Sequence, residues 1–259
     1  MFLSTLYVNV GDNPDRPRPG RLWLRNRYRV HQRLAMAFPS QKRKDEDPDF
    51  LQPYHPDDFG STTPPQLHIP RTVETGFLFR VDPLPGNRAV ILVQSAMKPD
   101  WDYAFANAKY LLRGDLPIQI RVYDPSFQPG QKLRFRLEAN PTKKVGTIAK
   151  SERERMESMG LSLPAGRHGR RVPADPSEWI RERADQHGFR LLDEPTIQTG
   201  WMLVRADNGH GKPDTKLFSA RYDGTLEVTD PIRFKDAVVK GIGPAKGFGF
   251  GLLSVVQLE

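Results

Sequence analysis

Tyr28 and His31 lie three residues apart near the start of the chain, and both side chains can transfer protons. Residues three apart are neighbours on the surface of a helix, so a helix here would present the pair together. An unperturbed imidazole titrates at about pH 6.5, whereas a phenol, with a pKa of about 10, is better suited to donate a proton or to position a substrate. Several arginines surround the pair: Arg21, Arg25, Arg27, Arg29 and Arg33.

These residue types fit one reaction on RNA that requires no metal ion. The 2′-hydroxyl of a ribose attacks the adjacent phosphorus and expels the 5′-oxygen. This step needs a proton acceptor, a proton donor and positive charge near the phosphorus. The sequence does not assign the acid and the base between Tyr28 and His31. The alternative for His31 is a structural histidine at the edge of the core.

A second cluster lies near the end of the chain, where five glycines and Lys246 fall within residues 241–251. Such a loop can turn backbone N–H groups toward an anion, and a lysine adds a point charge. A dinucleotide loop would follow a strand and precede a helix, and a Walker loop would contain Gly-Lys-Ser/Thr; neither description fits. The alternative is a tight helix-to-strand turn without a ligand. The candidate anion-binding residues are Gly241, Gly243, Lys246, Gly247, Gly249 and Gly251.

The composition narrows the classes of partner and site. The chain has 259 residues, a formal net charge of +8 and a pI of about 9.7, which favours a polyanionic partner, either nucleic acid or an anionic membrane surface. Because the chain has no cysteine, disulfides, zinc–thiolate sites and thiol nucleophiles are excluded. No apolar run approaches about 18 residues and no signal peptide opens the sequence, so we expect a cytoplasmic protein.

The elements that must position Tyr28 and His31 follow an α+β pattern. Asn26 is a candidate N-cap, and apolar residues after it recur at helical spacing as far as Phe38. The order of elements is βαββαβ, which is that of a ferredoxin-like unit. The predicted elements are a strand at 2–10, a loop at 11–20, a helix opening at Asn26, a hairpin of 73–81 and 89–95, a helical stretch at 101–112 and a strand at 118–123.

The same order recurs in the second half of the chain. The two halves share no clear residue-level repeat, so the duplication is inferred from element order alone. We therefore expect two tandem ferredoxin-like domains, residues 1–125 and 126–259. The predicted elements of the second are a strand at 133–139, a helix at 178–184 opened by Asp175, strands at 197–205 and 216–221, a turn at 222–224, a strand at 225–229, a helix before the glycine loop and a last strand at 252–258.

Two segments lie outside this pattern. Residues 40–71 are rich in proline and charge and predict a surface insertion, whose acids and His55 are expected to be solvated loop residues and not a metal site. A basic segment precedes the helix of the second unit and suits an arm that follows a phosphate backbone, with a solvated charged loop as the alternative. Its basic residues are Lys143, Lys144, Lys150, Arg153, Arg155, Arg167, Arg170 and Arg171.

Three motifs resemble those of the CasE family, also called Cse3, the CRISPR repeat endoribonucleases of the type I-E Cascade system. Residues 28–34 look like the family's Tyr-x-apolar-His-x-x-Leu helix, and residues 133–143 look like its Arg-x-Arg-x-x-Ala-Asn-Pro-x-Lys strand. Residues 241–254 look like its C-terminal signature, which is the most specific part of the match. The resemblance runs along the whole chain in order, and the chain departs from shorter members at residues 11–25 and 40–71.

The resemblance implies two ferredoxin-like (RRM-like) domains and cleavage of repeat RNA on the 3′ side of its stem-loop, without metal or cofactor. The expected ends are a 5′-hydroxyl and a 2′,3′-cyclic phosphate, and the enzyme would keep hold of the mature crRNA as one subunit of Cascade. Tyr28 and His31 match the active-site pair, while Lys143 and residues 167–171 match regions that grip the hairpin. Duplex RNA is read mostly through shape and backbone, which suits arginine-rich loops.

Two other classes of function stay open on the sequence. One is a non-catalytic RNA-binding subunit of the same fold, which a cleavage assay without metal would separate from a nuclease. The other is a basic protein of the membrane surface, which is disfavoured because no amphipathic helix has a cleanly basic polar face.

Overall fold

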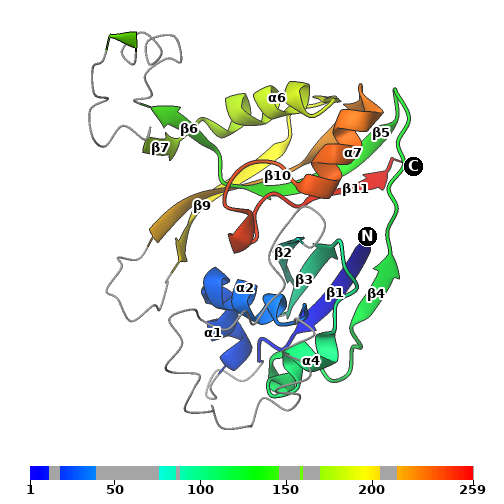
Figure 1. Ribbon diagram of the computed structural model, residues 1–259, viewed down its shortest axis with the longest axis vertical. Helices are drawn as coiled ribbons and strands as arrows, with labels where there is room; N and C mark the ends of the chain where they lie inside the picture. Colours follow the sequence, from blue (N-terminus) through cyan, green and yellow to red (C-terminus); the bar gives the residue numbers. More distant parts are fainter. Residues whose placement is uncertain are drawn as a thin grey trace.

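The computed structural model describes residues 1–11, 18–38, 76–85, 88–145, 158–159, 170–204 and 215–258. In this part of the chain two antiparallel sheets lie one above the other in the view of Figure 1, and each carries its own helices. The first has the strand order β2-β3-β1-β4, and the second has the order β11-β5-β10-β8, with β9 also paired to β10. Two tandem ferredoxin-like units result, as predicted.

In the first unit β1 is the central strand and pairs antiparallel with both β3 and β4. The predicted loop at 11–20 is partly wrong, because its last two residues open a helix, α1. Pro19 stands at the start of α1, where its missing N–H costs nothing, so this proline opens a helix instead of marking a loop. The elements are β1 (Phe2–Val8), α1 (Pro19–Arg25), α2 (Arg27–Ala35), β2 (Phe77–Leu84), β3 (Arg88–Ser95), α4 (Trp101–Phe105), η2 (Lys109–Leu111) and β4 (Gln119–Val122).

In the second unit β10 is a single strand of 14 residues, and the predicted turn at 222–224 is wrong. Tyr222 is fully buried and Gly224 pairs with Phe135, so the strand runs straight through. The sequence also gave no signal for β6, β7 and β8. The elements are β5 (Lys132–Ala139), β6 (Thr142–Val145), β7 (Arg170–Pro173), α6 (Pro176–Gln186), β8 (Phe189–Leu191), β9 (Thr196–Val204), β10 (Thr215–Val228), α7 (Pro231–Lys240), η3 (Lys246–Phe248) and β11 (Leu253–Gln257).

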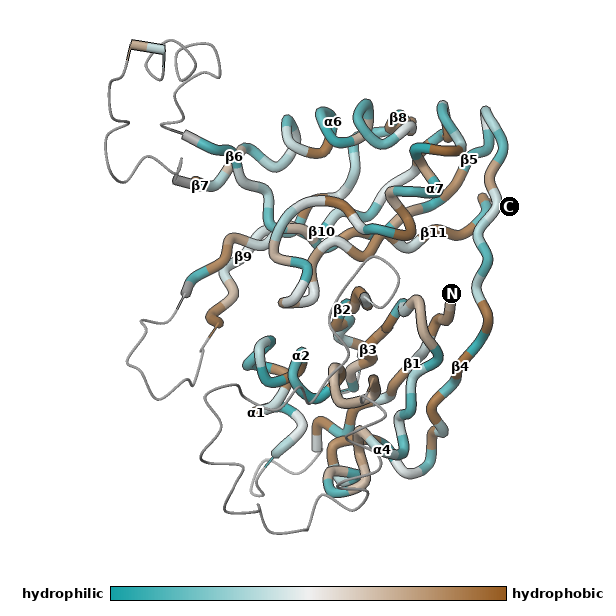
Figure 2. Tube along the Cα trace, in the orientation of Figure 1, coloured by the Kyte–Doolittle hydropathy of each residue, from teal (hydrophilic) through white to brown (hydrophobic). Residues whose placement is uncertain are grey.

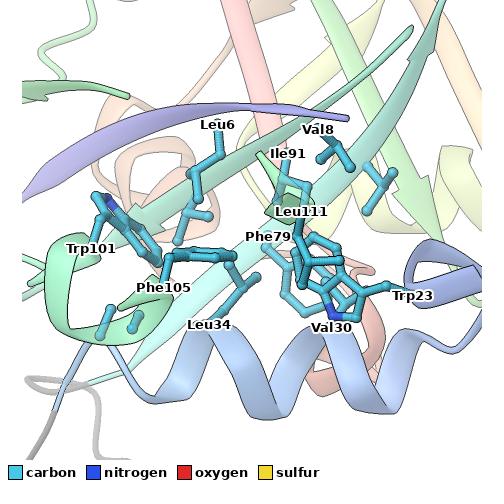
Figure 3. Packing of buried hydrophobic residues seen from close by; sticks show 14 of the residues in the cluster. Leu6, Val8, Trp23, Val30, Leu34, Phe79, Ile91, Trp101, Phe105 and Leu111 are labelled. Atoms are coloured by element: carbon cyan, nitrogen blue, oxygen red, sulfur yellow. The ribbon is translucent and has the colours of Figure 1, made fainter. Parts of the chain in front are cut away.

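Each sheet has its own hydrophobic core. In the first, Val30 and Leu34 of α2 are fully buried and point at the sheet, where they meet strand residues such as Phe79 and Ile91 (Figure 3). Along the tube of Figure 2, α2 is largely hydrophilic, so these apolar positions form a narrow stripe on an otherwise polar helix. Burial of this stripe fixes which face of α2 remains available for a site.

The second core lies between its sheet and the helices α6 and α7. Trp179 of α6 stacks on Tyr222 with ring centroids 6.1 Å apart, and the Tyr222 hydroxyl donates to the carbonyl oxygen of Pro176 at 3.0 Å. Phe234 and Val238 of α7 complete this core. The predicted domain division near residue 125 falls between β4 and β5.

A buried ionic network joins the two units. Arg80 of β2 is 4% exposed; its Nε donates to both carboxylate oxygens of Asp82 at 3.0 Å, and its Nη1 donates to Ser254 of β11 at 2.9 Å. Asp82 also contacts Arg221 of β10 at 3.3 Å. Gln94 of β3 adds a bond from its amide to the carbonyl oxygen of Val238 in α7, at 2.7 Å. These directional contacts fix the position of one sheet relative to the other.

Candidate functional site

The helix α2 places Tyr28 and His31 together, as the three-residue spacing predicted. The side chain of Asn26 caps the helix by accepting hydrogen bonds from backbone N–H groups of the first turn, including that of Tyr28 at 3.2 Å. This confirms the predicted N-cap. Because Val30 and Leu34 anchor the helix in the core, Tyr28 and His31 are left half-buried at its edge.

An aromatic stack fixes the plane of the His31 ring. The imidazole lies on the phenyl ring of Phe77 in β2, with centroids 5.4 Å apart and planes 16° apart. Phe77 in turn stacks on Phe38 at 5.3 Å. The Nδ1 atom of His31 is shielded from solvent. His31 is therefore at the edge of the core, as the structural alternative supposed, but its ring is also held in one orientation beside the second domain.

The glycine loop of the second domain meets the helix of the first. Its short helix η3 contacts both α2 and β2, and Figure 1 shows this loop reaching from α7 toward α2. The approach is close enough to require glycine: a Cβ on Gly249, which has a φ of 89°, would lie 3.0 Å from the ring of Phe79, and a Cβ on Gly241 would lie 2.8 Å from Leu78. The two clusters found in the sequence are thus brought together.

For three glycines of this loop, the structure corrects the expectation that the backbone N–H groups face an anion. The N–H groups of Gly241, Gly249 and Gly251 donate to carbonyl oxygens of the protein itself, at 2.9, 3.3 and 2.7 Å. Gly243 lies against Trp179, where a Cβ would approach the indole to 2.9 Å. Gly247 lies within η3 and is half-buried. The loop connects the two domains through its contacts with α2 and β2.

Lys246 is the charged side chain of this loop. Ala245, just before it, has a φ of 61°, in the left-handed region that side chains with a Cβ seldom adopt. The Lys246 Nζ donates to the carbonyl oxygen of Lys240 at 2.6 Å, at the end of α7. Partial burial lowers the pKa of Lys246 from its ordinary value, because desolvation disfavours the charged form.

A cleft of about 590 Å³ lies at this junction of the two domains. The ring of Phe77, on which His31 stacks, lines the cleft. Lys246 lines it as well, and so do Gln94 and Ser95 of β3. Of the candidate site residues, Lys246 lines the cleft directly, whereas His31 is connected to it through its stacking on Phe77.

Arg27 was expected to bind RNA, but its guanidinium points toward the domain interface. Its Nη1 atom is shielded from solvent, and the nearest acids are Glu138 of β5 and Asp82 of β2. Burial lowers the pKa of Arg27 and raises the pKa of Glu138, and the charge of each partner opposes the shift of the other. Arg27 therefore lies beside acidic residues at the domain junction, and its predicted contact with RNA stays a prediction.

Part of the predicted basic segment folds as a two-stranded ribbon. In β6 and β7, Lys144 lies opposite Arg171, and Lys143 lies opposite Val172. Lys143, Lys144 and Arg171 are exposed, and the Nη1 of Arg171 donates to the hydroxyl of Thr142 at 3.1 Å. The ribbon brings charges that are 27 residues apart in sequence onto one short structure, where they can face a phosphate backbone together.

The remaining basic residues predicted to bind RNA lie in α1, in β7 or outside the described residues. Arg21 and Arg25 are exposed on α1, beside the helix that carries Tyr28 and His31. Arg170 belongs to β7 by its backbone. The predicted insertion at 40–71 lies outside the described residues, as do four members of the basic segment: Lys150, Arg153, Arg155 and Arg167.

Sequence reasoning missed the residues that hold the site together, namely Phe77, Arg80, Asp82 and Glu138. A signal was present for two of them, because Arg80 and Asp82 fall within the strand β2, whose other residues from Phe77 to Val81 are all buried. A charged residue inside an apolar strand indicates a buried partner. The stacking of Phe77 on His31 had no such signal, because the partners come from elements far apart in sequence.

Within the described ranges no group of three or more metal-binding side chains is arranged to hold a metal ion. In the same part of the chain, no helix combines the length and the apolar character needed to cross a membrane.

Comparison with known proteins gives consistent matches. A family model described as CRISPR associated protein matches residues 1–257. The chain is 31% identical over 203 residues to the CRISPR-associated endoribonuclease Cse3 of Thermus thermophilus, covering 72% of this chain and 84% of that protein. It is 29% identical over 242 residues to the CRISPR system Cascade subunit CasE of Escherichia coli, covering 92% and 96%. A solved structure of CRISPR endoribonuclease Cse3 bound to a 19-nucleotide RNA matches with a TM-score of 0.65 at 27% identity, over 99% of this chain and 100% of that one.

Proposed function

Because the chain belongs to the Cse3 (CasE) family of CRISPR-associated proteins, we propose that it is a metal-independent endoribonuclease that cuts CRISPR precursor RNA on the 3′ side of the repeat stem-loop. The observation that carries this proposal is the meeting of α2, which bears Tyr28 and His31, with the loop that bears Lys246. Lys246 lines the cleft at the domain junction, and His31 stacks on Phe77, which lines the same cleft.

The reaction assigned to this site is an internal transesterification. The 2′-oxygen bonds to phosphorus and gives up its proton, while the bond from phosphorus to the 5′-oxygen breaks and that oxygen takes up a proton. The products are a 2′,3′-cyclic phosphate and a 5′-hydroxyl. Tyr28 and His31 carry the two proton transfers. Either residue can act as the base that accepts the 2′-hydroxyl proton, with the other as the acid that protonates the 5′-oxygen.

Lys246 contributes charge at the phosphorus. An ammonium group has three N–H donors, so the bond to the Lys240 carbonyl still permits donation to a phosphate oxygen. Because its bond to the Lys240 carbonyl already positions the ammonium group, it can stabilise the negative charge that builds up in the transition state. A half-buried cation is also worth more to that charge than one in open water.

The exposed cations account for RNA binding. The β6–β7 ribbon with Lys143, Lys144 and Arg171, and the α1 residues Arg21 and Arg25, contact phosphates of the stem-loop. After cleavage the protein keeps the crRNA and takes its place in Cascade, the assembly in which its Escherichia coli relative is a subunit. The same contacts serve substrate and product, because the stem-loop is unchanged by a cut on its 3′ side.

The test is cleavage of repeat RNA by the purified protein in excess chelator, with analysis of the ends. The wild type is expected to give a 5′-hydroxyl and a cyclic phosphate. His31→Ala is expected to lower the cleavage rate by about 10²- to 10⁴-fold and to leave RNA affinity within a few-fold. Gln32→Ala is the matched control, since Gln32 is exposed on the same helix as His31.

Two outcomes would count against the proposal. Cleavage by His31→Ala at the wild-type rate would remove His31 from the mechanism. RNA that is bound tightly but stays intact after long exposure to the wild type would make the chain a binding subunit without nuclease activity.

A further inference from the structure

Trp201 differs from the other tryptophans of the chain in its exposure. The chain has four, and Trp23, Trp101 and Trp179 are 8%, 4% and 2% exposed, whereas Trp201 is 64% exposed. It lies on β9 directly opposite Phe218 of β10, with ring centroids 5.3 Å apart and planes tilted by 54°. The Trp201 ring packs against Phe218 and is exposed to solvent, so it is available to stack on another flat group.

The register of β9 and β10 shows which surface this pair occupies. Side chains alternate along a strand, so Phe218 and Lys216 share a face with Tyr222. Tyr222 is covered by Trp179 of α6, which makes this the helix-bearing face of the sheet. The helix α6 covers the sheet around Tyr222 but does not cover Trp201. Trp201 is exposed to solvent, beside the exposed Lys216.

The basic ribbon begins at the same place. The side-chain amide of Asn140 donates to the carbonyl oxygen of Phe218 at 2.6 Å, and β6 starts two residues later, at Thr142. Where the ribbon returns toward α6, the N–H of Ala174 donates to the carbonyl oxygen of Pro141 at 3.1 Å. Figure 1 shows the β6–β7 ribbon and the β9–β10 pair extending to the same side of the second sheet.

We propose that Trp201 is a stacking platform for an unpaired nucleobase that flanks the stem of the bound RNA. Lys216 and the ribbon cations Lys144 and Arg171, which share one face of the ribbon, would hold the neighbouring phosphates. The inference deepens the proposed function and rests on it. Flat aromatic surface interleaved with cations matches a strand whose flat bases alternate with anionic phosphates, and stacking tolerates any base.

A protein neighbour is the other class of occupant that an exposed aromatic pair could have. The charges around Trp201 favour RNA over it. Interfaces between proteins are depleted in lysine at their centre, whereas Lys216 lies next to Phe218 on the same face, opposite Leu203. The ribbon adds further cations, and a single-stranded nucleic acid matches all of them.

The position of Trp201 gives a direct test by fluorescence of the full-length protein. Repeat stem-loop RNA with single-stranded flanks is titrated while tryptophan emission and iodide quenching are recorded, and Trp201→Phe serves as the reference that removes this fluorophore. RNA is expected to quench Trp201 and to shield it from iodide, while a blunt stem-loop without flanks is expected to do neither. An abasic nucleotide placed at successive flank positions should remove the effect at one of them.

Affinity measurements supply the second readout. Trp201→Ala is expected to weaken binding of the flanked RNA by about 5- to 150-fold, and Trp201→Phe by much less because a ring is retained. Leu203→Ala is the matched control: Leu203 is apolar, 36% exposed and two residues along the same strand. Its loss should change affinity by less than about threefold, since an aliphatic side chain offers no stacking surface.

The outcomes separate this inference from the proposed function. If the protein cleaves repeat RNA but Trp201→Ala binds it with wild-type affinity and RNA does not shield Trp201, the stacking role is refuted and the nuclease stands. Equal losses for Trp201→Ala and Leu203→Ala, with no dependence on any abasic position, would also refute it and indicate an apolar contact. Failure of the wild type to bind repeat RNA would refute both.

Discussion

The imidazole of His31 lies flat on the phenyl ring of Phe77, with ring centroids 5.4 Å apart and an angle of 16° between the planes. His31 belongs to α2 and Phe77 belongs to β2, and the predicted insertion lies between them in sequence. Phe77 also lines the cleft that Lys246 reaches from the second domain. One buried ring therefore connects the proton-transfer group with the cation.

Replacing Phe77 by Leu is expected to slow cleavage more than it weakens RNA binding. Leucine keeps an apolar core residue but removes the flat surface that orients His31, and a misplaced catalytic group costs about 10- to 100-fold in rate. Phe38→Leu is the control, because Phe38 stacks on Phe77 without forming the surface under His31. Both variants should lose about 1–3 kcal/mol of stability, measured by urea unfolding. Equal rates for the two variants would remove the orienting role of Phe77.

Replacing Gly249 by Ala is expected to destabilise the domain junction by about 1–3 kcal/mol. The residue has a φ of 89°, and a Cβ would lie 3.0 Å from the ring of Phe79. Gly114→Ala is the control, since its Cβ would meet nothing within 4 Å and no positive φ is involved. The thermal midpoint and the cleavage rate of each variant measure the effect. A Gly249→Ala protein as stable as the wild type would show that the close approach is not required.

Removing a ribbon cation is expected to weaken RNA binding equally for different sequences and to lower its salt dependence. For Lys144→Ala and Arg171→Ala, the slope of log affinity against log salt should fall by about one each, as for the loss of one phosphate contact. Lys132→Ala is the control, because this exposed lysine lies at the far end of β5 from the ribbon. A salt slope that neither ribbon variant changes would contradict the role of the ribbon.

Replacing Glu138 by Gln is expected to change how stability depends on pH. Burial raises the pKa of Glu138 above its ordinary value near 4.5, so the folded state holds this proton more tightly than the unfolded chain. The contribution of Glu138 to stability is then most favourable below pH 4.5 and falls as the pH rises through the raised pKa.

The Glu138→Gln protein lacks this titration. The difference in unfolding free energy, wild type minus variant, should therefore decrease as the pH rises above about 4.5, as measured by urea unfolding at several pH values. A difference that increases with pH would mean that the charge of Arg27 outweighs desolvation at this carboxylate.

Many elements of the fold could be predicted from local sequence patterns. Asn26 is an N-cap because its side chain can accept from backbone N–H groups that no helix turn satisfies, and this depends on neighbours within a few residues. The apolar stripe of α2 likewise follows from the spacing of apolar residues within the helix. The turn predicted at residues 222–224 failed because Gly224 favours a turn locally, whereas burial of Tyr222 and pairing with β5 favour a continuous strand.

The amino-acid sequence by itself determined that Tyr28 and His31 share a helix surface, that the chain is basic, and that glycines and Lys246 gather in one loop. Only the tertiary structure decided that this loop packs against α2 and β2, that Arg27 lies near Glu138, and that Phe77 stacks on His31. The physical reason is range: helix spacing and capping act between near neighbours, while stacking, desolvation and buried ion pairs arise only when distant segments are packed together.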